Sequence, residues 1–264
     1  MAISRVGVIG TGVIGEALIK ALIAFGLAPS SIKVSEKRGD RKVEIIERYG
    51  VKSLDSISNV DALLLAVKPQ DIEPTLKEFG KFDSSSPLVI SFAAGIKIAK
   101  ILDCLGSTAR ILRVMPNTPI ALGRGMSAIS VGRSATEDDI DWSKRFLSSS
   151  GEVIVVDEDL QDAVTATSGS GPAYFFAFTE AIAAAGERLG LSESDATLLA
   201  RETLIGAALM VEKSEKNLAT LRENVTSPNG TTAAALKNFK DSNFEESIFQ
   251  AMKAAKDRST ELST

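Results

Sequence analysis

The feature that most constrains the fold is a glycine-rich segment close to the start of the chain. An apolar run at residues 5–9 leads into Gly-Thr-Gly-Val-Ile-Gly at residues 10–15, and an amphipathic segment follows to residue 23. In this pattern the first glycine permits a tight turn, the second lets the backbone approach phosphates, and the third lets a helix pack against a strand. The N-terminus of that helix offers free N–H groups and a positive dipole to an anion. The order of strand, glycine loop and helix therefore predicts a dinucleotide-binding site, which glycines alone would not.

The composition of the chain limits the kinds of binding partner and the cellular compartment that we expect. The chain has 264 residues, a net charge of −4 and no basic tract, so we expect no nucleic-acid partner. No apolar stretch approaches the roughly 20 residues of a membrane span, so no membrane partner is expected either. Cys104 is the only cysteine, which excludes an internal disulfide, and the N-terminus has no signal-peptide pattern. These observations predict a cytoplasmic protein.

The chain contains no histidine. Catalysis by a histidine base and histidine-ligated metal sites are therefore excluded, and one cysteine cannot form a thiolate zinc site. We expect no metal. Any proton transfer must use Thr, Ser, Tyr, Lys, a carboxylate or water.

The first 160 residues alternate short apolar runs with helical patterns. Continuous β-branched runs between helices predict a parallel sheet covered on both faces. We therefore expect an α/β fold with a Rossmann-like dinucleotide-binding domain over residues 1–160. After the glycine loop, the predicted strands are at residues 32–34, 62–67, 88–92, 110–114, 126–131 and 152–156.

Residues 161–264 lack strand signals and show alanine-rich helical periodicity. Ser192 and Ser242 each precede an acidic residue by three positions, which predicts that both cap helices. About 100 residues of helix make a thin core, so we expect an all-α substrate-binding and dimerisation domain that buries its apolar faces in a homodimer. The alternative is a monomeric bundle that leans on the first domain.

Four further segments are unusual for simple core or loop: residues 65–69, 115–119, 165–174 and 225–232. In the last of these, hydroxyl groups and free N–H groups converge where a helix begins, at Thr231 or Thr232, and such a helix start suits a carboxylate. The alternative is an ordinary Pro-Asn-Gly turn with a threonine as N-cap. In the second segment, Asn117 either locks its loop or contacts a ligand.

Together these segments resemble the pyrroline-5-carboxylate reductase family over essentially the whole chain. The most specific stretches are Ser-Gly-Ser-Gly-Pro-Ala-Tyr at residues 168–174 and Thr-Ser-Pro-Asn-Gly-Thr-Thr at residues 226–232. The resemblance implies a Rossmann domain, a helical dimerisation domain, and homodimers that can assemble into a higher ring. It also implies hydride transfer from NADPH, or from NADH, to 1-pyrroline-5-carboxylate, which gives L-proline in the final step of proline biosynthesis.

The same resemblance implies the site residues. Ser227, Gly230, Thr231 and Thr232 would bind the substrate, and Thr232, as the catalytic residue, would hydrogen-bond the ring nitrogen. Glu215 falls where similar proteins carry a carboxylate near the site, although a solvated helix face is the alternative for it. The cofactor would be bound by Ile9, Gly10, Thr11, Gly12, Val13, Ile14, Ala66, Val67, Lys68, Pro69, Ala93, Ala94 and Asn224.

The choice between the two cofactors depends on the residues after the second predicted strand. Glu36 lies about 20 residues past the glycine loop, where an acidic residue usually bonds the ribose 2′-OH of NAD. Ser35, Lys37 and Arg38 surround it, and two cations can hold a 2′-phosphate. With Glu36 turned outward on a surface loop, we expect NADPH to be preferred, with NADH as the alternative.

One departure from the family pattern affects the substrate turn, where Asn229 replaces a glycine. Asparagine tolerates a left-handed φ better than most residues, so we expect the turn to form.

Two rival functions are a dehydrogenase of the β-hydroxyacid type and a non-catalytic NADP sensor. The first needs a lysine after glycines on a helix, which this chain lacks. The second does not need a hydroxyl-rich anion site.

Overall fold

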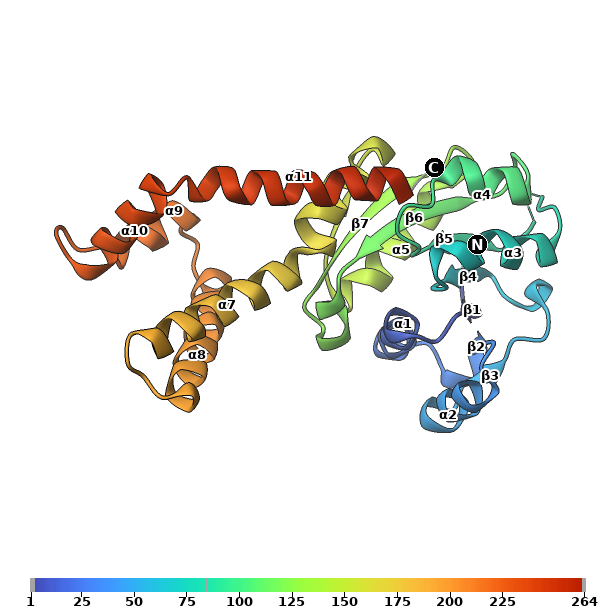
Figure 1. Ribbon diagram of the computed structural model, residues 1–264. Helices are drawn as coiled ribbons and strands as arrows, with labels where there is room; N and C mark the ends of the chain where they lie inside the picture. Colours follow the sequence, from blue (N-terminus) through green and yellow to red (C-terminus); the bar gives the residue numbers. More distant parts are fainter. Residues whose placement is uncertain (1–2, 84, 263–264) are drawn as a thin grey trace. The chain divides into compact units, whose positions relative to one another are not determined.

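The computed structural model describes residues 3–83 and 85–262. The chain divides into two compact units, Met1–Ser170 with Ala255–Thr264, and Gly171–Ala254. Figure 1 shows the helices and strands of each unit.

The first unit is built on an eight-stranded sheet in the order β3-β2-β1-β4-β5-β6-β7-β8. Neighbouring strands are parallel except β6 and β7, which are antiparallel. The expectation of a wholly parallel sheet is therefore wrong at this pair. The connection between β6 and β7 is only residues 117–124, which is too short for the crossover that a parallel pair requires. The strands are β1 (Val6–Ile9), β2 (Ile32–Ser35), β3 (Lys52–Ser53), β4 (Ala62–Leu65), β5 (Leu88–Ser91), β6 (Ile111–Pro116), β7 (Gly125–Val131) and β8 (Gly151–Val155).

Helices cover both faces of this sheet, as predicted (Figure 1). Because side chains alternate along a strand, Leu64 packs in one apolar cluster while Leu63 and Leu65 pack in the other. The first cluster takes side chains from α1, α2 and α5, and the second takes them from α3 and α4. These helices are α1 (Val13–Ala24), α2 (Gly39–Tyr49), α3 (Pro69–Phe79), α4 (Ile98–Leu105) and α5 (Glu137–Ser148).

The register of the sheet brings several loops to one edge. Ile9 pairs with both Ser35 and Leu65, and Leu65 pairs with Ser91. The chain therefore leaves β1, β2, β4 and β5 at the same carboxyl edge, which is where ligands bind in open α/β sheets.

The remaining elements are helical. The first unit continues through α6 (Gln161–Val164) and a π-helical turn at Thr165–Gly169, which the sequence patterns did not predict. The other helices are α7 (Gly171–Arg188), α8 (Glu193–Lys213), α9 (Leu218–Asn224), α10 (Thr231–Asp241) and α11 (Phe244–Leu262).

The two predicted helix caps have different outcomes. Ser192 is the N-cap of α8, and its hydroxyl accepts a hydrogen bond from the Asp195 N–H at 3.1 Å. The prediction for Ser242 is wrong, because this residue is the C-cap of α10. The chain turns into α11 through Asn243, which has a φ of 54°. A left-handed asparagine therefore makes the turn that the serine pattern suggested.

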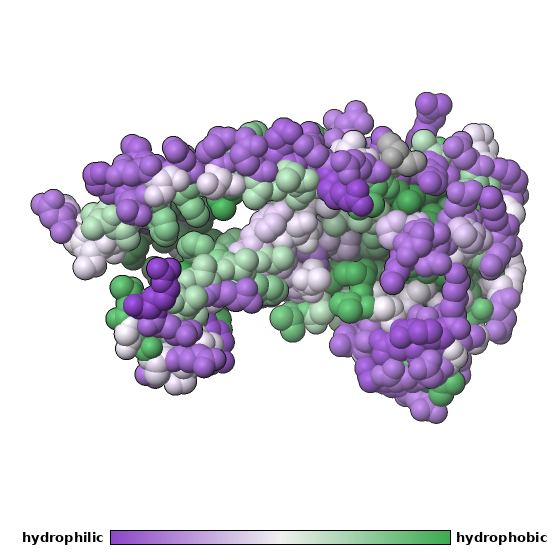
Figure 2. Space-filling view, viewed as in Figure 1, coloured by the Kyte–Doolittle hydropathy of each residue, from purple (hydrophilic) through white to green (hydrophobic). Residues whose placement is uncertain are grey.

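The second unit exposes most of its apolar side chains. Within residues 171–254, all of which the structure describes, the buried residues are Gly171, Ala196 and Ala200. Figure 2 shows green hydrophobic surface among the purple on the visible face of this unit. So much exposed apolar surface is characteristic of an interaction site. Among the described residues, no helix has both the length and the apolarity that a membrane crossing needs. The large exposed side chains include Phe175, Phe176, Phe178, Ile182, Leu198, Leu199, Ile205, Met210, Leu218 and Phe249.

Candidate active site

A cleft of about 960 Å³ opens at the carboxyl edge of the sheet in the first unit. Beyond the predicted residues, its lining includes Glu36, Leu54, Gln70, Asp71 and Phe79. The lining residues 54–57 follow β3, and the lining residues 70, 71, 75, 78 and 79 follow β4. No glycine pattern marks either group, so sequence reasoning missed them. The predicted cofactor residues that line the cleft are Ile9, Gly10, Gly12, Ser35, Lys37, Arg38, Ala66, Val67 and Lys68.

The glycine loop has the shape that a pyrophosphate needs. Gly10 has a φ of +86°, and a Cβ built on it would lie 2.9 Å from the Ala66 carbonyl oxygen. A Cβ on Gly15 would lie 2.0 Å from the Gly10 carbonyl oxygen, so both positions require glycine. A Cβ on Gly12, by contrast, would meet nothing within 4 Å. Gly12 is also the N-cap of α1, and no side chain caps that helix, so its first N–H groups are open to an anion.

The other predicted cofactor residues of this unit lie outside the cleft lining. Thr11 is fully buried. Val13 and Ile14 are the first two residues of α1, and Val13 is 71% exposed. Pro69 is the first residue of α3. Ala93 and Ala94 follow β5, at the same edge of the sheet.

The structure overturns the expectation that Glu36 points outward. Its Oε2 accepts hydrogen bonds from the Thr11 N–H and the Thr11 hydroxyl, both at 2.9 Å, and its Oε1 accepts one from the Arg38 N–H at 3.1 Å. Only 11% of the Glu36 side chain is exposed. Burial opposes ionisation, but the hydrogen bonds from Thr11 and Arg38 outweigh it, so the pKa of Glu36 lies below its ordinary value. Glu36 turns inward because the glycine loop offers it donors.

The two cations beside Glu36 are both near carboxylates. Lys37 Nζ lies 3.0 Å from Asp71 Oδ1 on α3, and Arg38 Nε lies 3.6 Å from Glu36 Oε1. Both cationic side chains are well exposed, at 70% and 64%. These pairs are therefore weak, and a bound anion can compete for either cation.

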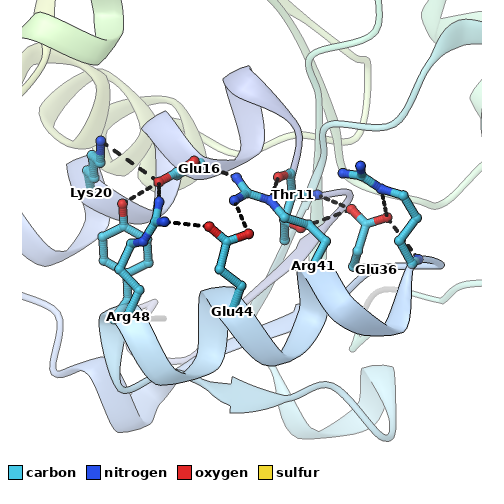
Figure 3. Close-up of polar contacts among 9 residues, drawn as sticks. Thr11, Glu16, Lys20, Glu36, Arg41, Glu44 and Arg48 are labelled. Carbon is cyan, nitrogen blue, oxygen red and sulfur yellow. Dashed lines mark hydrogen bonds and ion pairs between the residues drawn. The ribbon is translucent and has the colours of Figure 1, made fainter.

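A second polar network fastens α2 to α1 and to the glycine loop (Figure 3). Arg41 Nε donates to the Thr11 carbonyl oxygen at 3.1 Å, and the same guanidinium pairs with Glu16 on α1. Glu16 also accepts hydrogen bonds from the Tyr49 hydroxyl and from Arg48. The Tyr49 hydrogen bond is the largest influence on Glu16 and, with the two arginines, lowers the pKa of this carboxyl from 4.5 to about 2. The network ties the glycine loop and the start of α1 to α2.

Asn117 locks its loop in this structure. Its Oδ1 accepts a hydrogen bond from the Met126 N–H at 2.8 Å, and its Nδ2 donates to the Ser168 hydroxyl at 3.3 Å. One side chain thus joins the end of β6, the start of β7 and the π-helical turn. Of the two interpretations of Asn117, loop locking is the one that its contacts support.

In the second unit, residues 226–232 form the predicted turn and helix start. The Gly230 N–H donates to the Ser227 carbonyl oxygen at 3.0 Å, and Asn229 has a φ of 60°, as expected for this asparagine. Helix α10 begins at Thr231, with Gly230 as its N-cap and no side-chain cap. The alternative of a threonine N-cap is therefore wrong.

The hydroxyl groups at this helix start are available to a ligand. Those of Ser227, Thr231 and Thr232 make no hydrogen bond with any residue in the described part of the chain. Thr231 and Thr232 also occupy the first turn of α10, whose N–H groups have no side-chain acceptor. Three hydroxyls and a positive helix end together suit a carboxylate.

The last two predicted residues also belong to the second unit. Asn224 is the final residue of α9 and is exposed. Glu215 lies in the exposed segment between α8 and α9.

Comparisons with known proteins agree with both parts of this description. The family model for pyrroline-5-carboxylate reductase dimerisation matches residues 158–262. The family model described as NADP oxidoreductase coenzyme F420-dependent matches residues 5–95.

Similar proteins span the whole chain. The chain is 40% identical to pyrroline-5-carboxylate reductase from Corynebacterium melassecola over 98% of each chain. It is 37% identical to the Pseudomonas aeruginosa enzyme, in an alignment that covers 99% of this chain and 98% of that protein. Among solved structures, a pyrroline-5-carboxylate reductase from Coxiella burnetii shares 35% identity and superimposes with a TM-score of 0.91 over 100% of both chains. A pyrroline carboxylate reductase from Plasmodium falciparum, solved with NADP bound, shares 27% identity with a TM-score of 0.84 and covers 100% of both chains.

Proposed function

The chain belongs to the pyrroline-5-carboxylate reductase family, and from this membership we infer its reaction. It is an NAD(P)H-dependent oxidoreductase that reduces 1-pyrroline-5-carboxylate to L-proline, the final step of proline biosynthesis. The observation that carries this conclusion is the 40% identity to one reductase over 98% of both chains.

We propose that the cleft of the first unit holds the cofactor. The open space above Gly12 and the uncapped start of α1 support pyrophosphate binding there. Residues 9–14 would hold the pyrophosphate, and residues 66–69 with Ala93, Ala94 and Asn224 would line the nicotinamide half. Ser35, Lys37 and Arg38 would contact the adenosine end, which their position in the cleft lining supports.

We propose that the turn and first residues of α10 hold the substrate. Ser227, Gly230, Thr231 and Thr232 would bind the substrate carboxylate and ring nitrogen, and the free hydroxyls and the glycine N-cap support this role. Glu215 is a further candidate for the substrate site. Its exposed side chain leaves it accessible to a ligand.

The chemistry asks little of the protein's side chains. When bound, the reduced nicotinamide supplies a hydride, which adds to the carbon of the protonated C=N group, while the proton stays on nitrogen. No strong base is needed, which suits a chain without histidine. The protein's task is to orient the two reactants and to keep water away from them. In this proposal the Thr232 hydroxyl accepts a hydrogen bond from the ring N–H and so holds the proton at that atom.

Turnover with 1-pyrroline-5-carboxylate tests this function. The purified protein should oxidise NADPH or NADH and form proline, with the same rate in the presence of a chelator. Absence of proline above background, in a sample that circular dichroism shows to be folded, would overturn the proposal. Binding of NADPH without turnover would favour a sensor, and turnover of a 3-hydroxy acid would favour the β-hydroxyacid dehydrogenase alternative.

The chain is a homo-oligomer, since its C-terminal region matches the dimerisation model of the family. We propose that its homodimers assemble into a higher ring, which the large exposed apolar surface of the second unit supports.

We also propose a cytoplasmic location, supported by the single cysteine, and a functional division into residues 1–160 and 161–264. The compact units, which part at residue 170, support a division near this point. Cell fractionation and expression of residues 1–160 alone test the last two proposals.

A further inference from the structure

The inward position of Glu36 bears on which cofactor this cleft accepts. The glycine loop and the segment after β2 meet at this carboxylate, next to the space that the adenosine ribose would occupy in the proposed function. We propose that Glu36 is a specificity-determining residue that bonds a free ribose hydroxyl of NADH and disfavours the 2′-phosphate of NADPH. This inference rests on the proposed function, since it assumes that the cleft binds a nicotinamide dinucleotide.

The first argument is that Glu36 is held in place. Thr11 donates to one carboxylate oxygen through both its N–H and its hydroxyl, and the Arg38 N–H donates to the other. The Gly10 N–H adds a backbone bond to the Ser35 carbonyl oxygen at 2.8 Å, which fixes the strand end beside the loop. To swing Glu36 away from a 2′-phosphate, the protein would have to break these bonds and leave Thr11 with unpaired donors in a buried position.

The second argument is that the neighbouring cations do not offset this carboxylate. Lys37 and Arg38 contribute two positive charges, and Glu36 and Asp71 contribute two negative charges at the same place. These four charges cancel, so the two cations together with the carboxylates beside them offer no net attraction to an added phosphate. Lys37 must also leave Asp71 before it can hold that phosphate.

The third argument is the chemistry of the free acceptor sites. A carboxylate has about four lone-pair sites, and three donors already use Glu36. A ribose hydroxyl can donate to the remaining site, whereas a phosphate brings acceptor oxygens and negative charge, which a carboxylate repels. The pKa of Glu36 is lowered, so the group stays charged at neutral pH.

The test compares nucleotide affinities, which do not depend on turnover. Dissociation constants for NADPH and NADH are measured by titration calorimetry on the full-length protein, for the wild type, Glu36→Gln and Glu36→Ser. Glu47→Gln is the matched control, because this exposed residue of α2 loses the same charge outside the cleft lining. We expect both Glu36 variants to shift the affinity ratio toward NADPH by at least about tenfold. The control should shift it by less than about twofold.

Each other result has a defined meaning. An unchanged ratio, or a shift toward NADH, would overturn the inference. Loss of both nucleotides in both Glu36 variants would also overturn it, because Glu36 would then act only as a scaffold for the loop. If the wild type binds neither nucleotide, the proposed function fails instead. The two failures are therefore distinguishable.

Discussion

Replacement of Thr232 by alanine separates a substrate-binding role from a structural one. Helix α10 begins at Thr231 and has Gly230 as its N-cap, so Thr232 does not cap the helix. Its hydroxyl has no partner among the described residues, so its removal breaks no hydrogen bond within the described chain. Any effect of Thr232→Ala should consequently appear with substrate bound.

The expected magnitudes follow from these contacts. Alanine is the better helix former by about half a kcal/mol, so stability should stay the same or rise slightly. Loss of one hydrogen bond to a charged ring nitrogen should raise the activation free energy by about 1.5–3 kcal/mol. That corresponds to a fall in kcat/KM for 1-pyrroline-5-carboxylate of roughly 10- to 100-fold. The affinity for the reduced nicotinamide should not change, because in this proposal the Thr232 hydroxyl contacts the substrate and not the cofactor.

Three measurements on each variant decide the matter: steady-state kinetics, cofactor titration and a denaturant midpoint. Thr232→Ser is the matched control, because it keeps the hydroxyl group and should keep most of the activity. A lowered midpoint with unchanged kcat/KM in Thr232→Ala would refute the assignment. Equal losses in the serine and alanine variants would refute it too, because they would point to the missing methyl group rather than to the hydroxyl.

Three further predictions concern the loop, the acid stability and the assembly. Gly12→Ala should leave the fold intact and weaken cofactor binding at least about tenfold, because its Cβ enters the open space that a phosphate needs. Gly15→Ala should instead lower the denaturant midpoint, because its Cβ meets the Gly10 carbonyl at 2.0 Å. The pKa of Glu16 is lowered from 4.5 to about 2, so its contribution is complete above pH 4.5 and is lost as the pH falls toward 2. Unfolding curves of Glu16→Gln should therefore show lower stability at neutral pH and a smaller loss over that range. Light scattering should give a mass of at least two chains. A mass of one chain at micromolar concentration would contradict the inference that the exposed apolar surface is buried between chains.

The strands and the fold class were predictable because their signals are local. Each apolar run of the first unit lies within a residue or two of an observed strand, since a strand buried on both faces must be apolar throughout. The direction of β7 was not predictable from its own residues. It depends on the length of the connection from β6. That connection contains a short helical turn at Thr118–Leu122, so its length is not evident from the sequence. The two-residue strand β3 carries too few residues to form a pattern.

The site was predictable where backbone shape determines it. Gly10, Gly12 and Asn229 all adopt the geometry that their residue types suggested. Side-chain direction was a different matter, as Glu36 shows. Its position in the sequence was clear, but its orientation depends on donors supplied by Thr11, 25 residues earlier. Long-range contacts of this kind leave no spacing signal in a single sequence.

Both proposed binding regions rely on the same device, a helix that starts at a glycine. Helices α5, α8 and α9 have Thr136, Ser192 and Asn217 as N-caps, and each of these side chains accepts a hydrogen bond from one free N–H of the first turn. Helices α1 and α10 have Gly12 and Gly230 as N-caps and no side-chain cap. Helices α2, α3 and α4 also lack a side-chain cap, but none of their N-caps is a glycine. A capping side chain at either glycine would stabilise its helix by about 1 kcal/mol, but it would use the donors that an anion requires. The absence of a cap at these two helix starts therefore keeps their N–H groups free for the pyrophosphate and the carboxylate that the proposed function assigns to them.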